Sequence, residues 1–188
     1  MKSDAAVKPT LLALCGYQGA GKTTLARWLR DRHGFVCTSF ADGIRAAMRT
    51  WGVENADFVG ERKTSPCAAL CGATPRQVME RLGDFGRSVD PQFWTRLWSA
   101  NLPASDLIVV DDVRYEYEAT IAAQAANERA ACFACVVIDA PGRPQGTTHE
   151  SNRVPRVGSY RHALVVNDGS VHDLGFQVEH KLREWGFL

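Results

Sequence analysis

Five short apolar segments recur along the chain, and helical patterns of apolar residues separate most of them. The apolar segments span residues 11–15, 35–40, 107–110, 133–139 and 163–166. Each has the length of a buried strand. Apolar strands that are separated by helices are typical of a parallel sheet covered on both faces. The pattern therefore predicts a three-layer α/β/α fold with a five-stranded parallel sheet.

Helices are predicted where apolar residues recur every three or four positions. These patterns begin near residues 24, 44, 74, 91, 115 and 171. Three of the helices fall between the second and the third apolar segment, and the last two of them have a defined apolar stripe. Their predicted buried faces are Val78, Met79, Leu82 and Phe85 after Thr74, and Phe93, Trp94, Leu97 and Trp98 after Pro91.

Residues 74–77 (TPRQ) carry three helix-start signals. Thr74 is a typical N-cap, Pro75 suits the first helical position, and Gln77 completes a capping box. Arg76 then lies in the first turn, where a cation opposes the helix dipole and a bound phosphate would offset the cost. Arg45 is also expected in a first helical turn, just past the end of a strand. Both arginines are candidate anion-binding residues, and a solvated helix charge is the alternative for Arg45.

A glycine-rich stretch joins the first apolar segment to the first helix. Residues 16–23 (GYQGAGKT) fit G-x-x-x-x-G-K-[ST], the phosphate-binding P-loop of nucleoside triphosphate-binding proteins. Its backbone N–H groups and the helix dipole favour an anion at one point. Lys22 is expected to reach the β- and γ-phosphates, and the Thr23 hydroxyl to bind Mg²⁺. The candidate ATP-binding residues are Gln18, Gly19, Ala20, Gly21, Lys22, Thr23 and Thr24.

Two carboxylates end the third apolar segment, which is typical of the Walker B strand of P-loop proteins. Parallel strands end at the edge of the sheet where ligands bind, so Asp111 or Asp112 is expected beside the magnesium ion. Arg114 and Glu118 would lie one helical turn apart near the same edge. A local ion pair between Asp112 and Arg114, worth under about 1 kcal/mol, is the alternative interpretation.

Composition limits the remaining classes of protein. The 188 residues carry a net charge of +1, which argues against a dedicated nucleic-acid binder. No apolar run approaches a membrane span, and residues 11–15 are too few for a signal peptide, so a cytoplasmic location is expected. The six cysteines are then expected to be reduced. Cys132 and Cys135 would point to opposite faces of one strand, so a shared zinc ion is not expected.

The domain organisation is expected to be simple. Residues 1–9 resemble a flexible polar tail, and residues 10–188 are expected to form a single P-loop domain. Residues 52–73 show no clear period and predict a long loop or a small excursion. Residues 141–158 are polar and rich in glycine, and they predict a lid-like cover. The candidate lid arginines are Arg143, Arg153 and Arg156.

Several stretches, which together span nearly the whole chain and follow one another in the family's order, resemble those of the deoxynucleoside monophosphate (dNMP) kinases of tailed bacteriophages. The Arg76 helix and the Asp112-x-Arg114 element carry most of this resemblance. Between Gly83 and Trp94 the chain is shorter than some members, which leaves the role of Arg87 open. The similar stretches are the P-loop, residues 40–45 (FADGIR), residues 74–83 (TPRQVMERLG), Phe93-Trp94, residues 112–114 (DVR) with Glu118, Thr148-His149 and residues 166–169 (VNDG).

The resemblance implies an NMP kinase-like fold and transfer of the ATP γ-phosphoryl group to a dNMP. The products would be a dNDP and ADP for DNA precursor supply, with Mg²⁺ as cofactor. It implies that Trp94 borders the base of the acceptor and that Thr148 or His149 approaches ATP. The matched acceptor-site residues are Ile44, Arg45, Arg76, Gly83, Trp94, Asp112, Arg114 and Glu118.

The chemistry of such a transfer agrees with these residues. The acceptor phosphate is already ionised near neutral pH because its second pKa is about 6, so no general base is required. Lys22, Arg76 and Arg114 are the candidate catalytic cations that neutralise and align the two anions. Two alternatives stay open: a P-loop kinase for another small acceptor, and a non-catalytic ATP-binding regulatory protein. The sequence also does not determine which bases the acceptor carries, or whether the chain forms a homodimer through the tryptophan-bearing helices.

Overall fold

The computed structural model describes residues 8–142 and 154–188. The chain divides into two compact units, one made of residues 1–39 with 102–188 and the other of residues 40–101. The first unit contains β1 (Thr10–Cys15), α1 (Lys22–His33), β2 (Val36–Thr38), β3 (Leu107–Val113), α5 (Glu116–Glu128), β4 (Cys132–Asp139), β5 (His162–Val166) and α6 (Val171–Glu184). The second contains α2 (Asp42–Thr50), α3 (Pro75–Val89), α4 (Phe93–Ala100) and the 3₁₀ helices η1 (Asn55–Phe58), η2 (Gly60–Thr64) and η3 (Ala68–Leu70).

The five strands of the first unit form one parallel sheet in the order β2-β3-β1-β4-β5. The central strand β1 is buried at all six residues, and Leu12 pairs with Val109 on one side and with Ala134 on the other. A strand buried on both faces is expected to be continuously apolar, as residues 11–15 are. The predicted five-stranded parallel sheet is confirmed.

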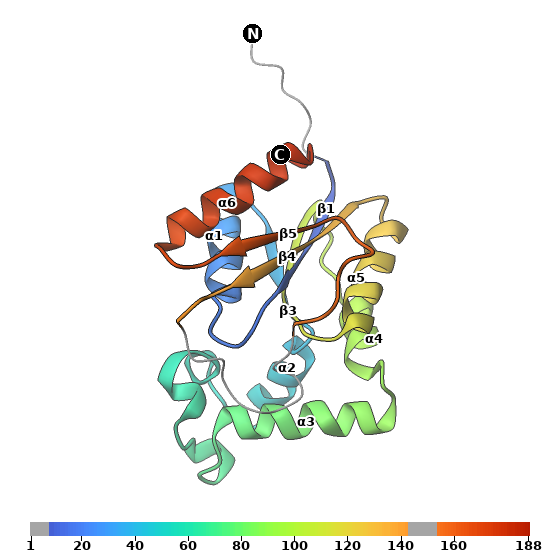
Figure 1. Cartoon of the computed structure of the whole chain (residues 1–188). Coiled ribbons are helices and arrows are strands. Elements are labelled where there is room, and N and C mark those ends of the chain that lie inside the picture. The colour runs from blue at the N-terminus through green and yellow to red at the C-terminus, as the bar shows by residue number, and fades with distance from the viewer. Residues whose placement is uncertain (1–7, 143–153) are drawn as a thin grey trace. The chain divides into compact units, whose positions relative to one another are not determined.

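Helices cover both faces of this sheet. Figure 1 shows α1 and α6 on one face and α5 on the other. Leu14, Val136 and Leu174 belong to the apolar core beneath α1 and α6. On the opposite face α5 buries mainly alanines, whose small side chains let the helix lie close to β1 and β4. The predicted three-layer α/β/α arrangement is confirmed.

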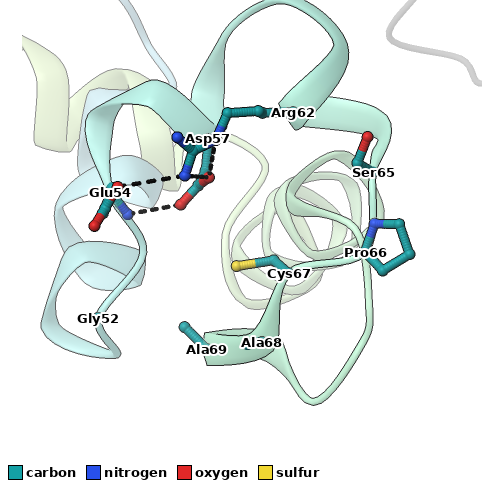
Figure 2. Close-up of a pocket in the computed structure, with 9 residues that line it drawn as sticks. All are labelled: Gly52, Glu54, Asp57, Arg62, Ser65, Pro66, Cys67, Ala68 and Ala69. Carbon is teal, nitrogen blue, oxygen red and sulfur yellow. Dashed lines mark hydrogen bonds and ion pairs between the residues drawn. The ribbon is translucent and has the colours of Figure 1, made fainter.

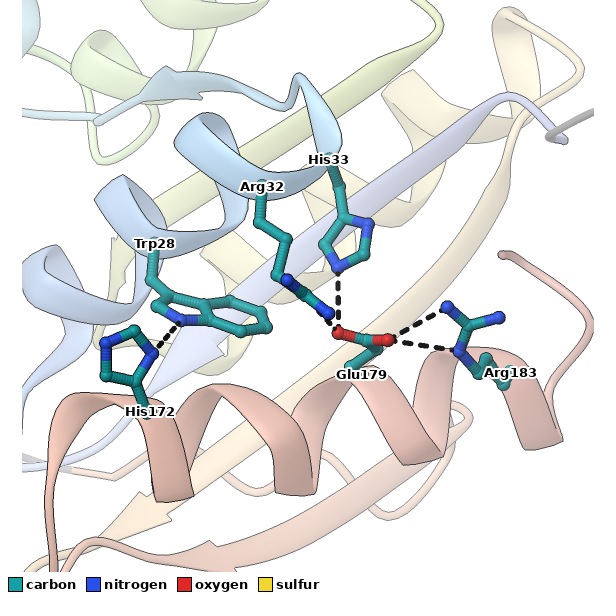
Figure 3. Close-up of polar contacts among 6 residues, drawn as sticks. All are labelled: Trp28, Arg32, His33, His172, Glu179 and Arg183. Carbon is teal, nitrogen blue, oxygen red and sulfur yellow. Dashed lines mark hydrogen bonds and ion pairs between the residues drawn. The ribbon is translucent and has the colours of Figure 1, made fainter.

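Polar contacts also join α1 to α6. Glu179 of α6 accepts hydrogen bonds from Arg32 Nε at 2.8 Å and from Arg183 Nη2 at 2.8 Å, and its Oε2 lies 3.2 Å from His33 Nε2 (Figure 3). These cations hold the pKa of Glu179 at about 2. We call Glu179 with Arg32, His33 and Arg183 the Glu179 cluster. It fixes the position of the helix that begins at the P-loop.

The second unit has an apolar core of its own. Ile44 and Met48 of α2 are buried in it together with Val53 and Phe58. The capping box that opens α3 is formed as predicted, because Gln77 N donates to Thr74 Oγ1 at 3.2 Å and Thr74 N donates to Gln77 Oε1 at 3.0 Å. The predicted aperiodic stretch, residues 52–73, contains the three 3₁₀ helices. Partly buried residues packed on this core include Cys67, Leu70, Val78, Met79, Leu82 and Trp94.

Three predicted buried positions of the second unit are wrong. Phe85 is 63% exposed, Phe93 is 37% exposed and Leu97 is 40% exposed. Helix α3 instead buries Gly83 and Gly86, and a Cβ atom on Gly86 would collide with the Trp94 indole. Because the packing face is made partly of glycines, the apolar stripe does not mark it.

The other predicted elements agree with the structure within a few residues. Strand β2 is shorter than the predicted residues 35–40, and β3 continues through both carboxylates to Val113. Within residues 8–142 and 154–188, no helix is both long enough and apolar enough for a membrane crossing. The single domain expected over residues 10–188 stays a prediction.

Candidate active site

The P-loop joins β1 to α1, and two of its glycines have backbone conformations that need glycine. Gly16 and Gly21 have φ angles of +144° and +102°, which residues with a side chain rarely adopt. A Cβ atom on Gly16 would lie 2.7 Å from the Ile138 carbonyl oxygen, and one on Gly21 would lie 2.5 Å from Asn167 Nδ2. Helix α1 begins directly after Gly21. The predicted strand, glycine loop and helix are therefore all present.

Lys22 turns its side chain back onto this loop. Its Nζ donates hydrogen bonds to the carbonyl oxygens of Gly16 at 2.6 Å and Tyr17 at 2.7 Å. Only 8% of Lys22 is exposed. The ammonium group is thus held within the P-loop, where the sequence predicts the phosphates of a nucleotide.

Charged side chains from β3 and from the residues after it lie near Lys22. Burial is the main cause that lowers the pKa of Lys22 to about 8, and the Arg114 guanidinium lowers it as well. Asp111 and Asp112 act in the opposite direction. The structure therefore brings four predicted site residues into one electrostatic neighbourhood, in which the Arg114 guanidinium disfavours the charged form of Lys22.

A β-bulge explains why both aspartates reach this neighbourhood. Ala13 pairs with Val110 and Cys15 pairs with Val113, so that one residue of β1 lies opposite Asp111 and Asp112 of β3. A bulge breaks the strict alternation of side chains and redirects them. Both aspartates are buried. Because of this bulge, the alternation of side chains along β3 does not decide which of the two aspartates would lie beside the magnesium ion.

Ser39, which was not predicted as a site residue, holds Asp112. Its hydroxyl donates to Asp112 Oδ2 at 2.5 Å, and both groups are buried. Ser39 lies just past β2, whose carboxyl end falls at the same edge of the sheet as the P-loop. This position just past a strand was the one signal in the sequence that could have marked Ser39 as a site residue.

Glu118 shapes the turn that carries Arg114. Its Oε2 accepts the backbone N–H groups of Arg114 at 2.7 Å and Tyr115 at 3.0 Å. Burial raises the pKa of Glu118 to about 8, and the nearby Asp112 carboxylate contributes to the rise. Glu118 therefore caps the start of α5, and its carboxyl group lies near that of Asp112.

The residues proposed for magnesium fit that ion chemically. Thr23 is exposed in the first turn of α1, and Asp111 and Asp112 lie in the bulge of β3. A hydroxyl with one or two carboxylates is an all-oxygen donor set, which Mg²⁺ prefers, and substrate phosphates and water complete such sites. Among the described residues, no three or more His, Cys, Asp or Glu side chains form a metal-binding group.

Five of the predicted acceptor residues belong to the second unit. Ile44 is buried in its core, whereas Arg45 Nη1 contacts Asp42 Oδ1 at 2.7 Å. Arg76 Nη1 lies 4.0 Å from Glu80 Oε1, one turn along α3. The predicted donor-side residues thus fall in the first unit, and much of the predicted acceptor set falls in the second.

Gly83 and Trp94 contact each other in the second unit. The Trp94 indole donates to the Gly83 carbonyl oxygen at 3.1 Å. Cβ atoms on Gly43 and Gly86 would both be in close contact with this indole. Trp94 therefore packs α2, α3 and α4 together, in addition to any contact with a base that the resemblance implies.

Several predicted residues lie outside the described part of the chain. Arg143, Arg153, Thr148 and His149 are among residues 143–153, and most of the predicted tail, residues 1–7, also falls outside. Arg156 is described and is exposed.

A cavity of about 270 Å³ lies in the second unit, lined by nine residues between Gly52 and Ala69 (Figure 2). Within it Arg62 Nε donates to Asp57 Oδ1 at 2.8 Å, and Glu54 N donates to Asp57 Oδ2 at 2.9 Å. None of the nine lining residues was predicted as a site residue. The lining of the cavity therefore contains none of the predicted site residues.

Comparison with known proteins supports the architecture. No protein-family model matches the chain. A solved structure from Chloroflexus aurantiacus, described as a "putative kinase", superposes with a TM-score of 0.54 at 11% identity, covering 95% of this chain and 98% of the other. A gluconokinase from Sinorhizobium meliloti superposes with a TM-score of 0.52 at 12% identity, covering 94% and 93%. The chain has the fold of a P-loop kinase.

The sequence is also similar to that of a viral protein. Over 186 residues the chain is 28% identical to a protein of Acanthamoeba polyphaga mimivirus named "Putative deoxynucleotide monophosphate kinase". The alignment covers 89% of this chain and 93% of the relative. The resemblance to dNMP kinases is therefore confirmed over most of the chain.

Proposed function

We propose that this protein is an ATP-dependent dNMP kinase, which transfers the γ-phosphoryl group of ATP to a dNMP and forms a dNDP and ADP. The observation that carries the proposal is the buried Lys22 ammonium within the P-loop, on which the Arg114 guanidinium acts electrostatically. The Arg114 guanidinium lowers the pKa of the Lys22 ammonium, and two neighbouring cations at a phosphate-binding loop favour a bound polyanion. The name of the mimivirus relative supports a deoxynucleotide as acceptor.

On the donor side, residues 18–24 and Lys22 would bind the phosphates of ATP. Backbone N–H groups at the start of α1 favour an anion there, and Lys22 Nζ would exchange its loop carbonyl partners for phosphate oxygens. Thr23 with Asp111 or Asp112 would hold Mg²⁺. When bound, that ion would neutralise charge on the β- and γ-phosphates.

On the acceptor side, Arg45 and Arg76 would bind the phosphate of the dNMP, with Ile44, Gly83 and Trp94 beside the nucleoside. Asp112, Arg114 and Glu118 would line the same acceptor site, with the Arg114 turn held by Glu118. Since the acceptor oxygen is ionised near neutral pH, charge neutralisation and alignment suffice and no general base is needed.

The reaction would supply deoxynucleoside diphosphates for DNA synthesis in the cytoplasm, in a phage-infected host if the chain is phage-encoded. A P-loop kinase for another small acceptor is the nearest alternative, and a gluconokinase with the same fold shows that this architecture serves other acceptors. A non-catalytic ATP-binding regulatory protein is the alternative from another class.

A coupled assay of ADP formation separates these functions. Mg-ATP is offered with dGMP, dTMP, dAMP, dCMP, modified pyrimidine dNMPs and the ribonucleotides in turn. We expect acceptor-dependent ADP formation with at least one dNMP. ATP binding without turnover across the whole panel would contradict the proposal and favour another acceptor or a non-enzyme.

A further inference from the structure

Asn167 lies directly after β5 and contacts the P-loop. Its Nδ2 donates a hydrogen bond to the carbonyl oxygen of Ala20 at 2.8 Å, and only 5% of the residue is exposed. Residues 166–169 belong to the resemblance described above, but no role for Asn167 follows from it. The contact gives this buried amide a specific target on the phosphate-binding loop.

The target is the peptide bond between Ala20 and Gly21. In a trans peptide the carbonyl and the N–H group point in opposite directions. Holding the Ala20 oxygen toward Asn167 therefore points the Gly21 N–H away from Asn167. Because glycine adopts positive and negative φ with similar ease, Gly21 alone does little to prevent this peptide from flipping.

A flipped peptide would harm anion binding. It would replace an N–H donor by a carbonyl oxygen at a loop whose function is to present donors to phosphate. Gly21 and Asn167 also pack directly together, since a Cβ atom on Gly21 would lie 2.5 Å from Asn167 Nδ2. The amide thus constrains Gly21 both by its hydrogen bond to Ala20 and by contact.

The amide itself is held by a well-anchored junction. Asn167 N donates to the Asp139 carbonyl oxygen at 2.7 Å, which joins it to the end of β4. Ser170 then caps α6, with Asp173 N donating to Ser170 Oγ at 3.2 Å. The side chain is therefore supported by the ends of two strands and the start of a helix.

We propose that Asn167 is a positioning residue for the phosphoryl donor, which fixes the Ala20–Gly21 peptide so that the Gly21 N–H faces the phosphates. This inference rests on the proposed function only in that the P-loop binds a triphosphate. It does not depend on the identity of the acceptor.

The test compares Asn167→Ala and Asn167→Asp with Gln177→Glu. Gln177 is a matched control because its side chain also bonds backbone at the end of β5, through Val166 N at 3.1 Å and Val166 O at 2.8 Å. Affinities for Mg-ATP and for inorganic tripolyphosphate are measured by calorimetry, together with the unfolding midpoint without nucleotide and the KM for the dNMP.

We expect both Asn167 variants to bind ATP and tripolyphosphate about tenfold more weakly, the effect of losing one hydrogen bond that orders a charged site. The KM for the dNMP and the kcat at saturating ATP should stay close to wild type. The Gln177→Glu protein should keep its triphosphate affinity even if its unfolding midpoint falls. Asn167→Ala removes the amide donor without adding a charge, so its comparison with Asn167→Asp separates the two effects. Asn167→Asp keeps the side-chain volume and remains testable if Asn167→Ala does not fold.

The inference would be overturned if Asn167→Ala bound the triphosphate with wild-type affinity. It would also be overturned if all three variants lost affinity in proportion to the fall in their unfolding midpoints. A wild-type protein that binds ATP but phosphorylates no dNMP would refute the proposed function, and Asn167 would still be judged on triphosphate affinity. A wild-type protein that binds neither ATP nor tripolyphosphate would overturn both.

Discussion

Ser39 and Asp112 form a buried contact between the end of β2 and the bulge of β3. In Ser39→Ala, Asp112 keeps its buried carboxylate but loses a donor, so the charge beside Lys22 is held less firmly. We expect a loss of about 1 kcal/mol in the free energy of unfolding and a fall of about tenfold in kcat/KM. Chemical denaturation and steady-state kinetics measure the two quantities.

Ser88→Ala is the control for this substitution, because the Ser88 hydroxyl is exposed and donates only to the carbonyl of its own helix. It should change neither quantity appreciably. Equal effects of the two substitutions would contradict a specific role for the Ser39 contact.

Arg76 tests the acceptor side of the site. It lies in the first turn of α3 beside Glu80, where we propose that it binds the phosphate of the dNMP. Arg76→Ala should weaken dNMP binding by about tenfold or more, the loss expected for a charged hydrogen-bonding partner, while ATP binding stays unchanged. Separate titrations with a dNMP and with ATP measure this.

Arg81→Ala provides the matched control, since Arg81 is an exposed arginine on the same helix. It should bind both nucleotides as the wild type does. Unchanged dNMP affinity in Arg76→Ala would refute the assignment of Arg76.

Single site residues could be predicted where a motif fixes them. The P-loop motif predicts Lys22 and Thr23, and the structure places Lys22 within the loop as expected. The choice between Asp111 and Asp112 could not be made, because the bulge that redirects them depends on the register with β1. Ser39 could not be predicted, since serines are common and its partner lies 73 residues away in sequence.

At the scale of the element, the Glu179 cluster fastens α6 to α1. The pKa of Glu179 is lowered from 4.5 to about 2 by Arg32 and Arg183, with His33 adding to the effect. A carboxyl group with a lowered folded-state pKa stabilises the fold above its unfolded pKa, and this contribution is lost as the pH falls from about 4.5 to about 2. Arg32 and Arg183 are 49% and 60% exposed, so solvent screens the interaction.

Glu179→Gln should therefore unfold more easily than wild type at pH 7, by about 1–2 kcal/mol. The difference should shrink as the pH is lowered toward 2, because the wild-type carboxyl then becomes neutral too. Urea denaturation at a series of pH values measures it. Glu184→Gln removes an exposed pair with Lys181 on the same helix and should have little effect at any pH. A difference for Glu179→Gln that does not depend on pH would contradict the role of its charge.

Most elements could be predicted from local signals. The capping box of α3 was correct because Thr74 and Gln77, three residues apart in sequence, form its hydrogen bonds with each other. The exposure of Phe85 could not be predicted, because α3 packs through Gly83 and Gly86 near Trp94. Hydrophobic periodicity cannot detect a packing face that lacks side chains.

At the scale of the whole molecule, the parallel sheet and its two helix layers followed from the spacing of apolar segments. The division into two units did not, because the second unit depends on tertiary contacts around Ile44 and Met48 that no local pattern reveals. The predicted donor residues lie in the first unit and much of the predicted acceptor set in the second.

The most direct test of this account follows the phosphoryl group itself. ATP labelled at the γ-phosphate with ³²P is incubated with the protein, Mg²⁺ and each dNMP, and the products are separated by chromatography. We predict label in a dNDP with the wild-type protein, and none above background with Lys22→Ala. Label only in inorganic phosphate, or in no product at all, would contradict the proposal that this P-loop kinase fold phosphorylates dNMPs.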